Sequence, residues 1–435
     1  MKKNEKSNKL TQLTCAALAL PGLVQTASAG RVEETYNADF QYGHYSESNQ
    51  RMDIDIFEGA ISVPIGKSMT ATVNMVKDVI GGASPIYNQR DPVTGKIYQV
   101  LSAASATSDS KCGDTICEQR DSISGGLTKF FDKGSLSLGG GYSREHDYAS
   151  KFFNTAASLD FNKKLTTLNF SASLAFDDIH PSDSAYTIYD ENNFKAHKTS
   201  QQYLLGVSQV IDKDSLILSN ITFGYHSGFL TDPYKQVTFY GSQEISGIPF
   251  PLPLPENGLS IQEKRPRERF EWAWLTQYVR HFEQFNHAAL HTDYRFSTND
   301  WGVNAHTVEF SWHQPVADGW QVIPRFRYYS QDQADFYQPV FDGTVIFDPV
   351  SESSIAKNMG AYSSDYRLAG FGTVSGGIKL SKEFTDLKPL AHLKFQTGFE
   401  YYAHKSEFQL GGTNHDGNFA DFGYYLLTAS VNLKY

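Results

Sequence analysis

A strict two-residue alternation of apolar and polar residues runs through this chain and is clearest at its end. In LLTASVNLKY, residues 426–435, apolar side chains occupy every second position from Leu427 to Leu433, and polar ones lie between them. Successive side chains of a β-strand point to opposite faces, so this period predicts a strand with unlike faces. A soluble protein could also end on such an edge strand, so these ten residues alone leave the fold open.

The same alternation recurs in many segments, among them TLNFSASLAF, AALHTDYRF, HTVEFSW, WQVIPRFRYYS and FEWAWLTQY. Sixteen segments of 10–15 residues can be delimited, joined by seven short turns and eight mostly longer connections in alternation. A soluble β-sandwich would explain the alternation but not this inequality of connections. We therefore predict an all-β fold: a single closed antiparallel transmembrane barrel of about sixteen strands, with short periplasmic turns and long extracellular loops.

The first 29 residues have the pattern of a secretory signal peptide. A cationic start, MKKNEKSNK, precedes a short apolar run and a small-residue cleavage site at Ala27–Ala29. We expect residues 1–29 to be removed and residues 30–435 to form a barrel in the cell outer membrane. Removing four Lys and one Glu would change the net charge from −10 to −13, which argues against a nucleic-acid partner. Beyond residue 29, no stretch approaches the ~20 apolar residues of a membrane helix.

Barrel closure would pair the last strand with the first. Leu427–Leu433 would then face lipid, and Tyr435 would lie in an aromatic girdle. We expect outer-membrane lipid and lipopolysaccharide to surround such a barrel. A terminal strand of this form also resembles the signal that the bacterial barrel-assembly machinery recognises. The choice between monomer and trimer stays open.

Two cysteines follow residue 29, Cys112 and Cys117 in CGDTIC. In an exported chain such a pair is readily interpreted as a disulfide, and no His at ligand spacing accompanies it to form a metal site. We therefore predict a Cys112–Cys117 disulfide that staples a loop. The sequence has no CxxCH haem-attachment motif and no cysteine-rich cluster, so we expect no cofactor and no metal.

If the apolar positions face lipid, the alternate positions face the lumen. The first strand, Val32–His44, would turn Glu33 and Asp39 inward. The second would add Asp53 and Asp55, provided that a β-bulge near Gly59 reconciles a change of phase in that strand. The predicted lumenal residues of the later strands are His291, Asp293, Arg295, Glu309, His313, Arg325, Arg327, Arg367, Lys379, His392 and Lys394.

Closure would place the acidic residues of the first two strands beside the basic residues of the last ones. A field across the lumen orients polar solutes and sets ion preference. The alternative is that these side chains pair across neighbouring strands and only satisfy one another. A carboxylate beside a histidine, as in Asp293 and His291, also invites a catalytic interpretation. Such neighbours arise freely in a polar lumen, so we do not favour it.

Two of the longer connections have unusual compositions. IPFPLPLPEN places prolines at alternate positions from Pro249 to Pro255, which predicts a stiff extended segment rather than a barrel strand. It could constrict the lumen, dock a partner or form a rigid outer loop. The connections 81–119 and 228–268 are long enough to plug the bore. GGTNHDGNFADF, with His415 and Asp416, indicates a flexible polar loop, because two ligands are too few for a metal site.

Several segments go beyond a generic barrel pattern: RMDIDIF, GGASP, RDSISGGLTKFF, YSSDYRLAGFGTVSGGIKLSK and the stretch from DYRFSTNDW to SQDQADFY. Together they resemble a family of bacterial outer-membrane barrels of unknown function, over nearly the whole chain after residue 29. Members of that family are often encoded beside periplasmic thioredoxin-like and flavin-transferring lipoproteins. The resemblance therefore implies periplasmic redox lipoproteins as partners, and it brings no catalytic motif.

Three functions are compatible with these patterns. We favour a porin-like channel for small polar solutes, because sixteen strands leave an aqueous bore. A non-conducting scaffold or conduit for a redox system is the alternative, and it rests on the resemblance alone. A surface hydrolase in barrel form is the third. His306 has no serine beside it, and no spacing links Asp365 with His415, so we expect no enzymatic activity.

Overall fold

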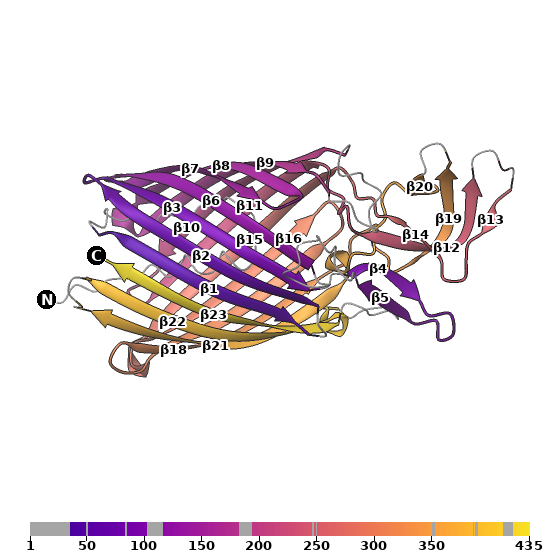
Figure 1. Ribbon diagram of the computed structural model, residues 1–435. Helices are drawn as coiled ribbons and strands as arrows, with labels where there is room; N and C mark the ends of the chain where they lie inside the picture. The colour runs from indigo at the N-terminus through magenta and orange to yellow at the C-terminus, as the bar shows by residue number, and fades with distance from the viewer. Residues whose placement is uncertain are drawn as a thin grey trace.

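The computed structural model describes residues 35–48, 51–82, 85–101, 116–181, 194–245, 248, 250–349, 353–385, 387, 390–411 and 421–435. Within these ranges sixteen strands form a closed barrel of antiparallel neighbours (Figure 1), which confirms the predicted fold class. In order around the barrel they are β1 (Asn37–Glu47), β2 (Met52–Ile65), β3 (Met69–Gly82), β6 (Ile116–Phe131), β7 (Gly134–Arg144), β8 (Tyr148–Phe161), β9 (Thr166–Ile179), β10 (Ala196–Val210), β11 (Ser215–Gly228), β15 (Glu268–Phe282), β16 (Ala288–Asn299), β17 (Asn304–Pro315), β18 (Trp320–Gln331), β21 (Phe371–Thr385), β22 (His392–Lys405) and β23 (Phe422–Lys434).

The first and last strands close the barrel. Asn37 of β1 pairs with Lys434 of β23, and the register continues without a break to Glu47 and Tyr424. Just beyond the strands, Tyr36 and Tyr435 exchange backbone hydrogen bonds of 3.0 and 2.9 Å. Closure pairs the strand edges that an open sheet would leave exposed, which is the condition for β-strands to cross a lipid bilayer.

The two faces of the barrel strands differ as the alternation predicts. Large apolar side chains such as Met75, Leu138 and Phe153 lie on the outer face and are 58–62% exposed. The inner face carries hydroxyl, amide and charged groups. Many pair across strands, as Ser135 does with Ser158 at 2.7 Å. An apolar exterior around a polar interior is the reverse of a soluble protein and is what a barrel in lipid needs.

The connections define two ends of the barrel. At the turn end they span residues 66–68, 132–133, 162–165, 211–214, 283–287, 316–319 and 386–391. At the loop end they span residues 48–51, 83–115, 145–147, 180–195, 229–267, 300–303, 332–370 and 406–421. Four short 3-10 helices lie in the described parts of these connections: η2 (Asn162–Lys164), η3 (Glu283–Phe285), η4 (Tyr366–Leu368) and η5 (Ser406–Phe408). In the part of the chain that the structure describes, no helix is long and apolar enough to cross a membrane.

The outer face becomes polar toward the loop end. His44 lies 2.9 Å from Asp55, and Lys77 lies 3.7 Å from Asp121. These pairs are a few residues from the loop-end termini of β1, β2, β3 and β6. The apolar belt is therefore shorter than the strands, and a charged collar extends beyond it.

This collar corrects the prediction for Asp53 and Asp55. The register of β2 with β1 and β3 runs through Gly59 without a shift, so the predicted bulge is absent. Without a bulge, Asp53 and Asp55 stay on the face of Phe57 and Ile61, which is the outer face. Placing them in the lumen was wrong. Along β2 the apolar residues switch from one set of alternate positions to the other. This switch marks the edge of the apolar belt and not a rotation of the strand.

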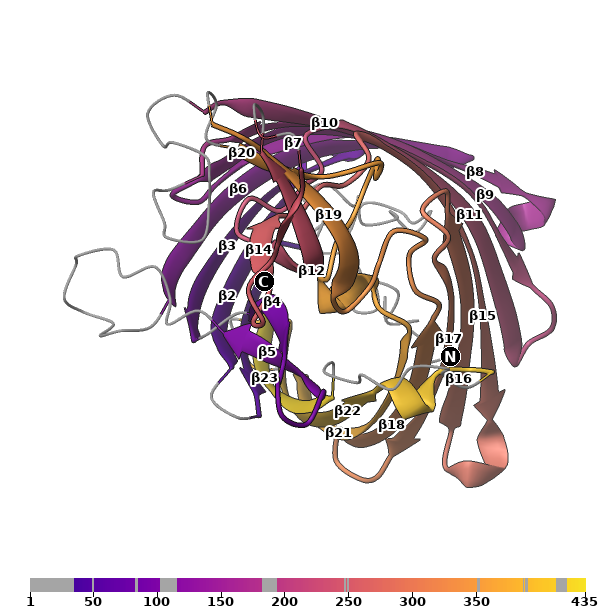
Figure 2. The same ribbon diagram turned by 90° about the vertical axis from the view of Figure 1, so that its right-hand side faces the viewer.

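Two long loop-end connections fold together into a small domain. We call residues 229–267 and 332–370 the cap. Its sheet contains β12 (Gln236–Ile245), β13 (Leu252–Pro253), β14 (Leu259–Gln262), β19 (Phe341–Asp348) and β20 (Ser353–Ala356), and it extends beyond the barrel (Figure 1). β12 pairs in parallel with β19, so neither connection can complete the sheet alone. Figure 2 shows β12, β14 and β19 lying across one side of the barrel mouth.

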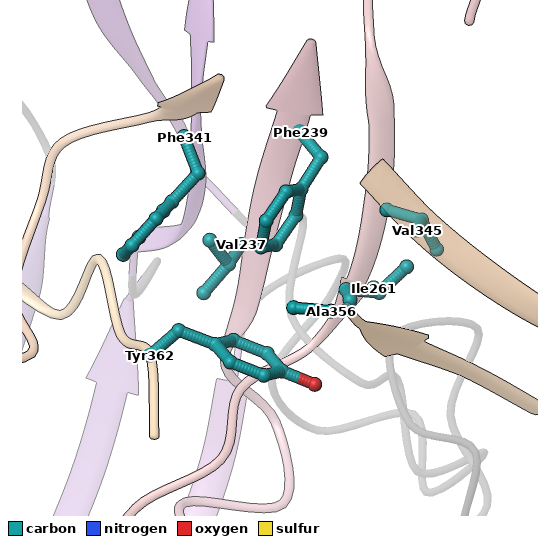
Figure 3. Packing of buried hydrophobic residues seen from close by; sticks show 7 residues of the cluster. All are labelled: Val237, Phe239, Ile261, Phe341, Val345, Ala356 and Tyr362. Atoms are coloured by element: carbon teal, nitrogen blue, oxygen red, sulfur yellow. The ribbon is translucent and has the colours of Figure 1, made fainter. Parts of the chain in front are cut away.

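The cap has a hydrophobic core of its own. Val237 and Phe239 of β12 are fully buried, together with Val345 of β19 (Figure 3). The Phe239 ring stacks on Phe341 with centroids 5.2 Å apart, and Tyr362 meets its edge at 5.6 Å. These contacts join the two connections, because Phe239 belongs to one and both of its ring partners belong to the other.

The proline-rich segment lies in the cap. Leu252 and Pro253 form β13, whose partners among the described residues are Ser242 and Gln243 of β12. Proline is tolerated there because β13 is an edge strand. Figure 1 shows β13 at the tip of the cap, away from the barrel, so the described part of this segment does not constrict the lumen.

The connection from β3 to β6 also packs against the cap. Its hairpin is formed by β4 (Pro85–Arg90) and β5 (Ile97–Leu101). The Asn88 side chain, almost fully buried, donates hydrogen bonds to the backbone carbonyls of Pro339 and Ser364 at 3.0 and 3.2 Å. The hairpin is therefore docked on the cap at the loop end of the barrel (Figure 1). Residues 83–84 and 102–115 of this connection lie outside the described part.

Candidate functional site

Charged side chains gather on the inner face of β16, β17, β18, β21 and β22. Arg325 of β18 lies among them, and its Nε and Nη2 donate to the two carboxylate oxygens of Glu309 at 2.8 and 2.6 Å. Its Nη1 donates to Glu400 of β22 at 2.6 Å. The two-pronged contact with Glu309 is the arrangement that a planar guanidinium favours. Arg325 is thus neutralised by two carboxylates rather than presented to a solute.

Four other basic side chains of this inner wall, among the described residues, have no ion pair or side-chain hydrogen bond: Arg295, Arg327, Lys379 and Lys394. For Arg327 the cause is visible in the register. Arg327 lies directly opposite Glu309, but both oxygens of Glu309 accept from Arg325. A positive charge is therefore left exposed to the lumen beside a satisfied ion pair.

Of the predicted residues of the first strand and the two cysteines, the structure describes Asp39 and the backbone of Cys117. Asp39 lies on the inner face at the turn end, where it accepts hydrogen bonds from Asn37 at 2.7 Å and from Asn432. Glu33 lies outside the described residues, as do His415 and Asp416 in the last loop-end connection. Cys117 belongs to β6, opposite Gly81, but its side chain and the whole of Cys112 are outside the described part.

The histidines that the sequence places near carboxylates lie on both faces of the barrel. His291 and His313 face the lumen with ring centroids 4.2 Å apart. Asp293 accepts a hydrogen bond from Gln277 at 3.1 Å. His306 is on the outer face, where its Nδ1 lies 2.9 Å from the Tyr294 hydroxyl. Within the described ranges, no three His, Cys, Asp or Glu side chains are placed to hold a metal ion.

Arg367 is not in a barrel strand, and its predicted lumenal position was wrong. It lies in η4 (Tyr366–Leu368), a 3-10 turn of the cap that precedes β21. Asp365 caps this turn by accepting from the Arg367 backbone N–H at 3.1 Å. Local alternation predicts that the strand β21 already includes Arg367. In the structure the capped turn occupies this position, and β21 begins only at Phe371.

Arg367, itself half exposed, belongs to an ionic cluster around the buried Asp365 that joins the two halves of the cap. Its Nε donates to Asp365 at 2.8 Å, and its Nη2 donates to Asp232 of the other connection at 2.7 Å. Arg265 lies 2.7 Å from both Glu263 and Asp365. The carboxylates of Glu263 and Asp365 have no exposed surface, so each depends on these partners and not on water.

The cluster shifts the pKa values of its two buried carboxyl groups in opposite directions. Burial opposes ionisation of Asp365, but Arg367 and Arg265 outweigh it and hold the Asp365 pKa well below its usual range. Burial raises the pKa of Glu263, although the nearby Arg265 lowers it. Asp365 is therefore the permanent anion of the cluster, and Glu263 is the member that binds a proton more readily.

Several charged groups of the lumen were not anticipated from the sequence. They include Glu400, which holds Arg325, and the pair His226–Glu271 at 3.2 Å. Lys198 of β10 also pairs with Asp177 of β9 at 3.1 Å. The alternation marks such residues as inward-facing, but it does not state which of them meet. That depends on the register between neighbouring strands, which the local sequence leaves open.

The sequence model of the family described as "Protein of unknown function (DUF3570)" matches residues 10–426. No match was found among curated proteins. Among solved structures, the chain is similar to a "Bacterial polysaccharide outer membrane secretin", with 6% identity over 93% of this chain and 99% of that one and a TM-score of 0.47.

Two further solved structures cover a similar share of the chain. The outer membrane protein opdK from Pseudomonas aeruginosa has 8% identity, covers 92% of this chain and 99% of its own, and gives a TM-score of 0.39. OmpT of Vibrio cholerae has 9% identity, covers 92% and 98%, and gives a TM-score of 0.38. The family match spans nearly the whole sequence, and the chain therefore belongs to the DUF3570 family.

Proposed function

We propose that this protein is a porin-like channel of the bacterial outer membrane that passes small polar solutes. The observation that carries the proposal is the inner wall from β16 to β22, where Arg295, Arg327, Lys379 and Lys394 face the lumen without ion pairs among the described residues. Unpaired charge is costly to keep in a packed interior, but it is stable where water fills the space. The apolar outer face supports a location in the membrane.

The adjoining wall, formed by β1, β2 and β3, carries acidic side chains. Asp39 of β1 and Glu58 of β2 lie on the inner face, and Asp78 of β3 pairs with Arg120. β1 is joined to β23, so the acidic strands adjoin the basic wall around the circumference. A lumen with acidic and basic sides orients dipolar solutes and separates the paths of anions and cations.

The cap supports a selective rather than a freely open channel. Its sheet lies across one side of the mouth (Figure 2), and its ionic cluster and hydrophobic core hold it as a folded unit. A rigid cap does not need to move in order to limit the size of the solutes that enter. We therefore expect a conductance smaller than that of an uncapped barrel with the same number of strands.

Conductance in planar bilayers tests the proposal. Refolded protein should give discrete current steps, and Arg295→Glu with Arg327→Glu should shift ion preference toward cations. Neither arginine has an ion pair in the described structure, so the variant should still fold. Lys77→Glu, on the outer face, is the matched control and should leave the preference unchanged. A folded barrel that never conducts would contradict the channel and favour the scaffold for periplasmic redox lipoproteins.

A further inference from the structure

A cavity of about 220 Å³ lies in the lumen, on the inner face of five consecutive strands near the loop end. It is remote in sequence from the basic wall described above. Its lining residues come from β6 to β10 and the connection between β7 and β8: Arg120, Ser143, Glu145, Tyr148, Ser173, Ala175, Asp177, Lys198, Ser200 and Gln202. Ala175 is the only aliphatic side chain among them, so the cavity is suited to a polar occupant.

Several polar groups around this cavity lack partners. Ser143 and Gln202 are 4% and 8% exposed, and neither side chain makes a hydrogen bond within the described residues. The hydroxyl of Ser150, which pairs with Ser143 across β7 and β8, and the Nε of Arg120 are buried without a partner there. Buried polar groups are almost always hydrogen-bonded. Those facing the cavity are therefore placed to bond its occupant.

Three of the four charged members of the lining, Arg120, Asp177 and Lys198, are held in ion pairs, and the fourth, Glu145, also interacts with a neighbouring group. Lys198 lies 3.1 Å from Asp177 and donates to the Tyr148 hydroxyl at 3.0 Å. Arg120 forms an ion pair with Asp78 of β3. An anion or a cation entering the cavity would have to break one of these pairs. A neutral solute would keep them and would bond the free hydroxyl and amide groups.

The rim of the cavity is held in place by the cap and by the adjoining wall. Tyr234 of the cap donates a hydrogen bond to Asp147, in the connection that contributes Glu145 to the lining. Ser200 lies 2.9 Å from His226, which in turn lies 3.2 Å from Glu271. These bonds fix the lining before a solute arrives, and such preorganisation favours binding.

We propose that this cavity is a binding site for a neutral polyhydroxylated solute of monosaccharide size. Its volume equals that of about seven water molecules at ~30 Å³ each, or a solute with on the order of ten non-hydrogen atoms. Hydroxyl groups both donate and accept, as the unpartnered serine and glutamine groups require. The proposal rests on the proposed channel, because solutes in transit would reach the cavity through the lumen.

Equilibrium dialysis of refolded, detergent-solubilised protein with radiolabelled glucose tests the site. We expect saturable binding that other neutral sugars displace and that lactate and glycine do not. Gln202→Leu keeps the side-chain size but removes the amide, and it should weaken binding about tenfold. Gln201→Leu is the matched control: the adjacent residue is on the outer face, bonded to Tyr203, and its loss should not affect binding.

The outcomes separate this site from the channel. Absence of saturable glucose binding in protein that conducts would overturn the site and leave the channel, with water alone in the cavity. Saturable binding in protein that does not conduct would overturn the channel and leave the site. Preferential binding of lactate or glycine would contradict the neutral class. Ser143→Ala, which removes only a hydroxyl, replaces Gln202→Leu if heat-modifiability on gels shows that the latter does not fold.

Discussion

Arg325 of β18 and Glu400 of β22 form a 2.6 Å ion pair although a complete strand, β21, lies between them. The contact passes over Gly377, which is opposite both residues in the register. A Cβ at position 377 would overlap both the Glu400 side chain and the backbone carbonyl oxygen of Phe399, so the glycine leaves the space in which the guanidinium crosses the strand. Three strands are thereby linked on the inner face at one level of the barrel.

Substituting Gly377 by valine should break this link. The new side chain would displace Glu400, and we expect overpacking to lower the free energy of unfolding by about 1–3 kcal/mol. Urea unfolding of the refolded barrel measures the change. Gly376→Val is the control, because a Cβ at position 376 meets nothing within 4 Å. Equal effects of the two substitutions would show that backbone flexibility and not the ion pair was lost.

Asp365→Asn should loosen the cap while the barrel remains intact. The substitution leaves the largely buried Arg265 and the half-exposed Arg367 beside a neutral amide, and removing one partner from such a cluster costs about 3 kcal/mol, the lower end of the range for buried pairs. Hydrogen exchange of cap amides such as Val237 should accelerate, whereas barrel amides should not change. Asp342→Asn disrupts an exposed pair with Arg90 at 3.4 Å and should have little effect. Slow exchange of the cap in both variants would contradict the role of the cluster.

The stability of the cap should be greatest near pH ~4, between the ordinary pKa values of the Asp and Glu carboxyl groups. Asp365 has a lowered pKa, so its contribution is complete above the ordinary carboxyl value of ~3.9 and is lost as the pH falls through its own pKa. Glu263 has a raised pKa, so its contribution is complete below ~4.3 and is lost as the pH rises through that pKa. Fluorescence of Trp301, packed beside the cap, can follow urea unfolding across this range.

Glu263→Gln should remove the decline on the alkaline side and keep the decline on the acid side. The glutamine does not titrate, whereas Asp365 still loses its charge in strong acid. A stability profile that stays flat from pH 4 to pH 8 in the unmodified protein would contradict the assignment of Glu263.

Two adjacent residues of β9 should respond to arginine in opposite ways. Phe170 is on the apolar outer face, where arginine costs about 2–4 kcal/mol near the middle of a bilayer. Ser171 faces the lumen, where arginine remains hydrated, so Ser171→Arg should be tolerated. Refolding into lipid vesicles and urea titration compare the two variants. Similar losses for both would show that the apolar face of β9 is not in contact with lipid.

The sequence by itself determined the class of fold and the direction of most side chains. A period of two is a local property of a strand, and the inequality of faces follows from it without reference to any partner strand. The inner-face placement of Arg325, Arg327 and Lys379 follows in the same way. The same logic failed for Asp53 and Asp55, because alternation distinguishes two faces but does not show where the apolar belt ends.

Only the tertiary structure decided which inward-facing groups meet. Arg325 finds Glu400 across a strand because of the register and because position 377 has no side chain, and neither can be inferred from one segment. The cap could not be predicted from the sequence for the same reason. β12 and β19 are about 100 residues apart and pair in parallel, so neither connection contains a signal for the sheet that both complete. In a barrel, the alternation within a strand determines the direction of its side chains. The function depends on contacts between segments that are distant in the sequence.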